Sequence, residues 1–247
     1  MAADKVLIRN PVGYNMNVLA ERLQHLENML DLDSWKTIFD IGACNGWEGV
    51  NFAKVFPDAR VYSFEPSVAN HVRCADTYSK QIPDVVNRIT LVKAALTDAT
   101  GLIEFYAIDE EQARQAGNVN HGMGSILEIV NPRILPWEYS IQKKEMVSGY
   151  RLDDWCEQNL IQSVDALWVD VQGAELHVFK GAEKQLANVQ AIMTEAGLEA
   201  YYHGHTMKAD IDQFLSSLGF QELTEARQYH AQGLEVNAIY VNQRFIR

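Results

Sequence analysis

Residues 38–49 read IFDIGACNGWEG, and this stretch decides the fold. An apolar run ends in Asp40, and Gly42, Gly46 and Gly49 follow it. Glycine-rich turns between a strand and a helix let backbone N–H groups approach a ligand closely, most often a nucleotide. The stretch therefore predicts a strand, a tight turn and a helix that together hold a nucleotide-type cofactor.

Strands and helices alternate on both sides of this turn. Short β-prone runs at 36–42, 59–66 and 88–98 are separated by segments of helical periodicity at 47–56 and 68–80. Such alternation is typical of parallel βαβ units, so we expect an α/β protein with a doubly wound sheet. Further strands are expected at 101–108, 189–197 and 234–243, a strand leading into a helix over each of 145–158 and 164–186, and a helix at 208–220.

The predicted domain organisation is simple. One main domain is expected over 36–247, preceded by an N-terminal helical extension over 1–35. Within that extension, 15–31 has leucines at helical spacing, which indicates an amphipathic helix. The extension could form a lid or the arm of a homodimer. The polar, glycine-containing stretch 109–125 is expected to be a loop over one face of the sheet.

The composition excludes several classes of protein. Of the 247 residues, 47% are hydrophobic, which is enough for a packed core and argues against disorder. Lys and Arg number 21 against 33 Asp and Glu, and a net charge of −12 makes nucleic acid an unexpected partner. No apolar run approaches the roughly 18–20 residues that a membrane span needs. Three scattered cysteines fit reduced thiols, so we expect a soluble cytoplasmic protein.

The glycine spacing and two acids indicate which cofactor is bound. Gly42, Gly46 and Gly49 do not fit the G-x-G-x-x-G pattern of dinucleotide sites, and the chain has no P-loop motif. A carboxylate at Asp40 would repel a diphosphate but suits the sulfonium and ammonium groups of S-adenosylmethionine. Glu65 ends the next strand, where an acid can accept hydrogen bonds from two ribose hydroxyls.

Two longer motifs resemble the FkbM-type methyltransferases. The first is FDIGACNGWEGVNFAKVFPDARVYSFEPSVANHVRC at 39–74, and the second is LWVDVQGAELHVFKGAEKQL at 167–186. Between them LVKAALTDATGLIEFY (91–106) resembles the family's third strand and hairpin, and AIMTEAG (191–197) its next strand. The resemblance covers about 36–197, with the motifs in the family's order.

The resemblance implies a class I methyltransferase fold, Rossmann-like, with a seven-stranded sheet whose last strand is antiparallel. It also implies O-methylation of a hydroxyl group on a sugar, a glycan or a secondary metabolite. Asp40, Gly42, Ala43 and Gly46 would line the methionine part of the cofactor. Cys44 departs from the family's usual asparagine. The full set of cofactor contacts implied is Asp40, Gly42, Ala43, Cys44, Gly46, Glu65, Pro66, Ala94 and Ala95.

Candidate catalytic residues lie where later strands end. Asp170 ends ALWVD and Glu195 ends AIMTE, and both are expected at the carboxyl edge of the sheet, where ligands bind in open α/β folds. Asp170 is predicted as the base or orienting residue, with Glu195 in support and His121 as a further candidate base. The alternative for each acid is a helix N-cap or a loop hydrogen bond.

The pattern leaves two further questions open. His203 and His205, like His121, could act as a general base, and the three could join Asp170 and Glu195 around a divalent metal. Solvated histidines are the commoner outcome, and a metal is not favoured. Aromatic side chains that could stack on a sugar ring are Tyr201, Tyr202, Trp137 and Tyr139, although core packing is the commoner role of such residues.

Three other functions remain as alternatives to an O-methyltransferase. An NAD-type oxidoreductase is disfavoured by Asp40 and the glycine spacing. A nucleic-acid methyltransferase is disfavoured by the net charge and by the lack of an Asn/Asp-Pro-Pro-aromatic motif. A non-catalytic cofactor-binding module is disfavoured by the acids at Asp40, Glu65, Asp170 and Glu195. The acceptor itself has no signature in the sequence.

Overall fold

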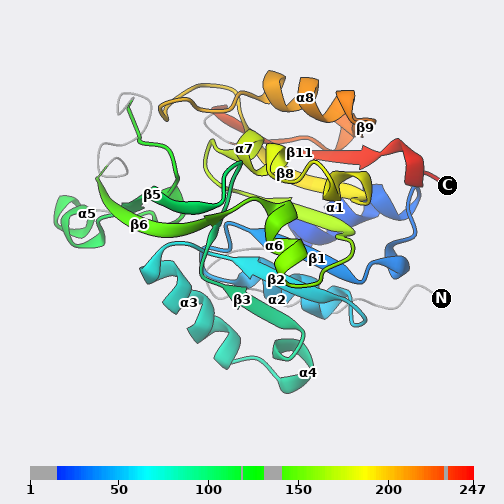
Figure 1. The fold of residues 1–247 in the computed structure, drawn as a ribbon, viewed down its shortest axis with the longest axis horizontal. Coiled ribbons are helices and arrows are strands. Elements are labelled where there is room, and N and C mark those ends of the chain that lie inside the picture. The colour runs from blue at the N-terminus through cyan, green and yellow to red at the C-terminus, as the bar shows by residue number, and fades with distance from the viewer. Residues whose placement is uncertain (1–15, 118, 131–140, 231–232) are drawn as a thin grey trace.

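The structure, a computed structural model, describes residues 16–117, 119–130, 141–230 and 233–247. Its main sheet follows the order β10-β11-β8-β7-β1-β2-β3, with β9 also paired to β11 (Figure 1). The expected class I arrangement is confirmed, because five parallel strands are followed by the antiparallel β11. The strands are β1 (Thr37–Ile41), β2 (Arg60–Phe64), β3 (Ile89–Val92), β7 (Ala166–Val169), β8 (Ala191–Gly197), β9 (Phe220–Glu222), β10 (Gln228–Tyr229) and β11 (Glu235–Asn242).

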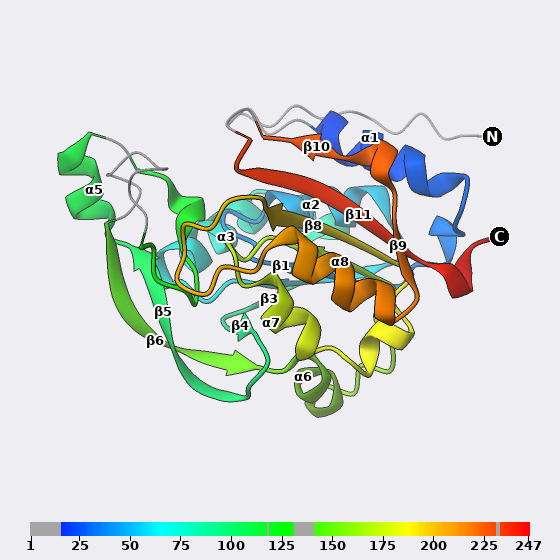
Figure 2. The same cartoon turned by 90° about the horizontal axis from the view of Figure 1, so that it is seen from above.

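Helices cover both faces of this sheet, as Figure 2 shows. Successive side chains of a strand point to opposite faces, so Ile38 of β1 joins one apolar cluster and Phe39 joins the other. The first cluster includes α1 (Met16–Glu27), α2 (Trp47–Val55), α3 (Val68–Ser79) and α4 (Pro83–Val86). The second includes α6 (Leu152–Gln158), α7 (Glu175–Lys180) and α8 (Lys208–Ser217).

Residues 16–35, the part of the predicted N-terminal extension that the structure describes, contribute to the first apolar cluster. Leu23 and Leu26 of α1 are 2% and 0% exposed, and they belong to the same apolar cluster as residues of β1, β2, β7, β8 and β11. Burying such side chains fully contributes about 1.5–3 kcal/mol each. The helix therefore shares a core with the sheet rather than standing apart from it.

A second, smaller sheet stands at the carboxyl end of the parallel strands (Figures 1 and 2). Its order is β4-β6-β5, from β4 (Ala95–Leu96), β5 (Gly101–Ile108) and β6 (Gln142–Tyr150). The chain between β5 and β6 contains α5 (Glu110–Ala116) and the 3₁₀ helix η2 (His121–Met123). Other 3₁₀ turns are Leu32–Ser34, Gln185–Ala187, Thr224–Ala226 and Gln243–Phe245.

The prediction of a loop over 109–125 is wrong for its first half. The side chain of Asp109 accepts a hydrogen bond from the backbone N–H of Gln112 and so caps the start of α5. Gly117 ends the helix with a φ of 116°, a conformation that favours glycine. Both capping residues are visible in the sequence, but the polar composition between them hides the helix.

Among the described residues, no helix combines the length and the apolar character that crossing a bilayer requires.

Candidate functional site

The glycine turn joins β1 to α2, and its glycines are required by packing inside the protein. A Cβ on Gly42, whose φ is 89°, would lie 1.8 Å from the backbone oxygen of Asp170. A Cβ on Gly46 would lie 2.7 Å from the ring of Tyr78, and one on Gly49 would lie 2.5 Å from the hydroxyl of Ser63. The turn thus packs closely against Asp170, Tyr78 and Ser63. The contact with Asp170 holds the ends of β1 and β7 close together at the carboxyl edge.

Asp40 lies beneath this turn. Its side chain is 0% exposed, and its Oδ2 accepts a hydrogen bond of 2.9 Å from Ser63 Oγ. Burial raises the pKa of Asp40 to about 7. Asp40, Ala43 and Gly46 are outside the set of residues that line the cavity described next. These three residues would therefore affect cofactor binding through the shape of the turn. A direct contact between any of them and the cofactor stays a prediction.

A pocket with about 510 Å³ of empty space, which includes open solvent, lies at the carboxyl edge between the main sheet and the smaller sheet. Residues from both sequence motifs contribute to its wall. Those predicted from the sequence are Gly42, Cys44, Glu65, Pro66, Ala94, Ala95 and Asp170.

Glu65 forms a polar part of the wall. Its Oε2 accepts a hydrogen bond from the backbone N–H of Cys44, and its Oε1 accepts one from Ser67, both at 2.8 Å. Burial raises the pKa of Glu65 to about 8. A carboxylate has about four acceptor positions, so this orientation leaves capacity for two hydroxyls of a ribose.

Apolar side chains form the rest of the pocket. Ala94 and Leu96 come from the chain after β3, while Phe105 and Ile126 come from the smaller sheet and the segment that follows η2. The carboxyl group of Glu65 can bind the ribose hydroxyls of an adenosine group, and the apolar wall beside it can contact the adenine ring. The residues present therefore fit the predicted cofactor, S-adenosylmethionine. The sequence reading missed Phe105 and Ile126.

Asp170 and Glu195 are brought together through one amide. The Nε2 of Gln172 donates to Asp170 Oδ1 at 2.7 Å and to Glu195 Oε2 at 2.9 Å. Burial raises the pKa of both acids, and the charge of Asp170 raises that of Glu195 further. Asp170 lines the cavity, whereas Glu195 is outside the set of lining residues.

His230, which the sequence reading missed, lies beside these acids. Its Nε2 is 3.1 Å from Glu195 Oε1, and the charge of Asp170 acts on it. Burial lowers the pKa of His230. No local motif marks this histidine, because only the pairing of β10 with β11 brings it to the carboxyl edge.

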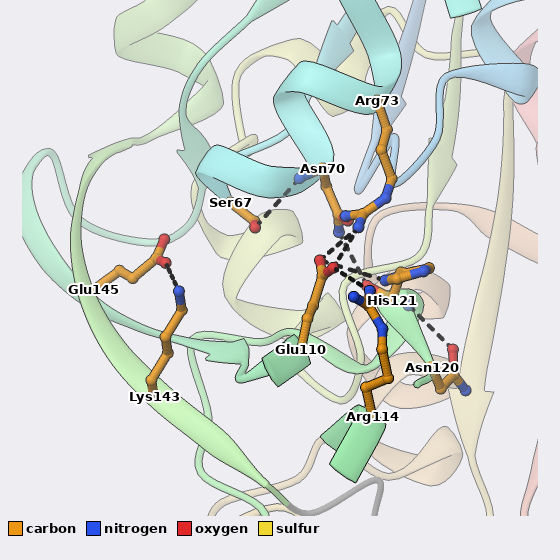
Figure 3. A network of polar contacts seen from close by, with 10 residues as sticks. Ser67, Asn70, Arg73, Glu110, Arg114, Asn120, His121, Lys143 and Glu145 are labelled. Atoms are coloured by element: carbon orange, nitrogen blue, oxygen red, sulfur yellow. Dashed lines mark hydrogen bonds and ion pairs between the residues drawn. The ribbon is translucent and has the colours of Figure 1, made fainter. Parts of the chain in front are cut away.

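The predicted base His121 lies in a different polar cluster, shown in Figure 3. Its Nδ1 is 3.4 Å from Glu110 Oε1 of α5. The guanidinium of Arg73, on α3, donates to both oxygens of Glu110 at 2.6 Å. Burial and the charge of Arg73 lower the pKa of His121. The ion pair of His121 is thus with Glu110 of α5, whereas Gln172 is the residue that contacts both Asp170 and Glu195.

The segment 109–125 is held over the cavity from both sides. On the α3 side, Asn70 Nδ2 donates to the backbone oxygen of His121 at 3.0 Å (Figure 3). On the β7 side, Ser125 Oγ donates to the backbone oxygen of Gln172 at 2.8 Å. Asn70, Gly122 and Gly124 line the cavity, so this segment forms its cover.

The histidines and tyrosines at 201–205 are not arranged as a metal site or a sugar platform. His205 is buried against the ring of Tyr201, and burial lowers its pKa to about 4. Tyr201 and Tyr202 are 1% and 2% exposed, so they pack in the core instead of offering a face to a sugar. His203 is exposed. The other two aromatic candidates, Trp137 and Tyr139, lie outside the described residues.

Comparison with known sequences identifies relatives. Residues 40–222 match the family model described as the methyltransferase FkbM domain. The 2-O-methyltransferase NoeI of Sinorhizobium fredii (strain NBRC 101917 / NGR234) is 29% identical over 170 residues, which are 68% of this chain and 65% of that protein. The match therefore spans less than two thirds of that relative.

Solved structures share the fold at low identity. Magnesium protoporphyrin IX methyltransferase (ChlM) from Synechocystis PCC 6803, solved with bound S-adenosylmethionine, gives a TM-score of 0.50 at 11% identity, covering 94% of this chain and 81% of that one. The METTL16 methyltransferase domain gives a TM-score of 0.51 at 8% identity, covering 95% and 70%. These likenesses concern the fold alone.

Proposed function

Because the chain belongs to the FkbM methyltransferase family, we propose that it moves the methyl group of S-adenosylmethionine to a hydroxyl of a sugar, glycan or secondary metabolite. The observation that carries the cofactor assignment is the charge of the cavity. Its wall contains two carboxylates, Glu65 and Asp170, and no lysine or arginine of the described residues. Such a wall suits a cationic ligand and disfavours the diphosphate of NAD.

Specific residues would hold the cofactor and activate the acceptor. Glu65 would bind the ribose hydroxyls, and Leu96 and Phe105 would border the adenine. When bound, S-adenosylmethionine supplies a methyl group on a cationic sulfur, which an oxygen nucleophile aligned with the carbon–sulfur bond can displace. Asp170 would accept the proton of the acceptor hydroxyl, and Gln172 would hold the carboxylate in position for that transfer.

The choice of a hydroxyl acceptor rests on the relative named above, which is a 2-O-methyltransferase. A small acceptor rather than a nucleic acid is supported by the net charge of −12. An NAD-type oxidoreductase and a non-catalytic module remain the alternatives to be tested against it.

Calorimetry should show that the protein binds S-adenosylmethionine and not NAD. Glu65→Gln is expected to weaken that binding by about 10- to 100-fold, because a hydrogen bond to a charged group contributes about 1.5–3 kcal/mol. The control is Glu104→Gln, which changes an exposed acid paired with Lys144 on the smaller sheet and should leave affinity unchanged. Transfer of labelled methyl to a panel of defined glycans and hydroxylated small molecules then tests the reaction.

Two results would count against this proposal. Preferential binding of NAD would favour the oxidoreductase. Binding of S-adenosylmethionine without transfer to any acceptor in the panel would favour the non-catalytic module.

Glu110→Gln should speed the dissociation of the cofactor by about two- to fivefold. The substitution removes the charge that pairs with Arg73, and partly exposed ion pairs contribute up to about 1 kcal/mol. Because this pair ties α5 to α3, the segment over the cavity should open more often. Stopped-flow measurement of ligand release would detect the change.

The matched control is Asp76→Asn, which breaks the exposed ion pair between Asp76 and Lys80 at the other end of α3. It should leave the release rate unchanged. Equal rates for the wild type and Glu110→Gln would mean that the Arg73–Glu110 pair does not hold the cover closed.

A further inference from the structure

Three neighbouring strands place two carboxylates and an imidazole on one side of the main sheet. Glu195 of β8 lies opposite Asn237 of β11, and Glu235 is two residues earlier on β11, so the two acids share a face. His230 follows β10, and its backbone N–H donates to the backbone oxygen of Glu235 at 3.0 Å. One ligand atom from each of Glu195, His230 and Glu235 lies within 4.8 Å of the other two.

The side chains converge at short distances. His230 Nε2 is 3.1 Å from Glu195 Oε1, and His230 Nδ1 is 3.5 Å from Glu235 Oε2. Gln172 holds the second oxygen of Glu195 at 2.9 Å, so Oε1 is directed toward the imidazole. The imidazole distinguishes this group from a common cluster of acids, because it adds a nitrogen ligand to two oxygen ligands.

Burial makes the concentrated negative charge of this group costly. The side chains of Glu195 and Glu235 are 10% and 15% exposed, and Asp170 adds a third carboxylate through Gln172. Arg22 and His230 supply positive charge nearby, but the acids outnumber them. A bound divalent cation would offset the remaining charge directly.

We propose that Glu195, His230 and Glu235 bind one divalent transition-metal ion close to Asp170, to which Gln172 connects Glu195. Two carboxylates and one imidazole suit manganese or zinc better than calcium or magnesium, which prefer oxygen ligands alone. Three protein ligands leave further positions for water and for an oxygen of the acceptor. A hydroxyl bound there would lose its proton to Asp170 more readily. This role of the metal in activating the acceptor hydroxyl rests on the proposed methyl transfer, whereas the binding of the metal does not.

Manganese binding to the full-length protein tests the proposal. Loss of the electron paramagnetic resonance signal of free Mn²⁺, together with calorimetry, should show one ion per chain. His230→Gln and Glu235→Gln should each weaken Mn²⁺ binding by at least about tenfold. Replacing a residue that only hydrogen-bonds to a metal ligand often causes a loss of that size, and these two residues are proposed as ligands themselves. The control is His177→Gln, because His177 of α7 also lies 3.0 Å from a carboxylate, that of Asp98, but is partly exposed and lies on a different element from the proposed ligands. Circular dichroism would verify that the variants are folded.

The outcomes separate the metal site from the methyl transfer. Specific Mn²⁺ binding that is lost in His230→Gln and kept in His177→Gln supports the site, even if no acceptor is methylated. Absence of stoichiometric binding, or equal affinity in the wild type and His230→Gln, overturns it. If the wild type transfers methyl groups at an unchanged rate after chelation and binds no Mn²⁺, the metal proposal fails while the proposed function stands.

Discussion

Asp170→Asn is expected to reduce methyl transfer by about 10²- to 10⁴-fold while cofactor affinity is nearly unchanged. Asparagine keeps the shape of the side chain and can still accept the hydrogen bond from Gln172, but it cannot take up a proton. Burial raises the pKa of Asp170, so wild-type activity should increase as the pH rises and this carboxyl ionises. The variant should lack that increase. Single-turnover rates measured across a pH series would test both expectations.

The control for this variant lies at the other end of the same strand. Asp165 precedes β7, and its Oδ2 accepts hydrogen bonds from the backbone N–H groups of Lys36 and Thr37 at 2.7 and 2.9 Å. Asp165→Asn should lower stability without changing the rate per folded molecule. A rate for Asp170→Asn within tenfold of wild type would show that another group, with Glu195 and His230 as candidates, accepts the proton.

The sequence predicts the parallel core well because two independent signals agree there. The apolar runs of β1, β2 and β7 are short, and each ends in a polar residue or turn followed by a helical pattern. In parallel sheets such strand ends meet at one edge, so Glu65 and Asp170 could be assigned to one cavity from their positions alone. The fold and these two acids follow from the same pattern.

The residues that escape prediction are those placed by non-local pairing. Phe105 reaches the cavity from β5, which belongs to a separate sheet, and Ile126 follows the cover segment. His230 reaches Glu195 only because the two-residue strand β10 pairs with β11. The position of a side chain in the sequence does not reveal such contacts. They depend on which strands pair and in which register, and strands such as β10 and β11 are far along the sequence from the glycine turn. The contact of His121 with Glu110 of α5 was likewise not predicted, and its role as a base stays a prediction.

The glycines at 42, 46 and 49 illustrate a different gap between sequence and structure. Their pattern correctly indicates a tight turn, and Gly42 of that turn lines the cavity. The physical reason for each glycine, however, is close approach to the protein itself, at the Asp170 carbonyl, the Tyr78 ring and the Ser63 hydroxyl. A substitution in the turn should therefore affect folding before it affects ligand contacts.

Gly42→Ala is accordingly expected to lower the free energy of unfolding by about 2–5 kcal/mol. The left-handed backbone, with φ at 89°, costs a non-glycine residue about 1–2 kcal/mol. The new Cβ would also lie 1.8 Å from the backbone oxygen of Asp170, and overpacking of this kind costs about 1–3 kcal/mol. Because a domain's total stability is about 5–15 kcal/mol, the loss should be large in urea unfolding curves.

Gly219→Ala separates the two causes. Gly219 has a φ of 88°, nearly the same as Gly42, but a Cβ there would meet nothing within 4 Å. This control should cost only the backbone preference, about 1–2 kcal/mol. The difference between the two variants then measures the clash with the Asp170 carbonyl. Equal losses would mean that β7 moves aside at little cost. In that case the carboxyl edge that holds Asp170 is less rigid than the packing around Gly42 implies, and Gly42→Ala should retain cofactor binding.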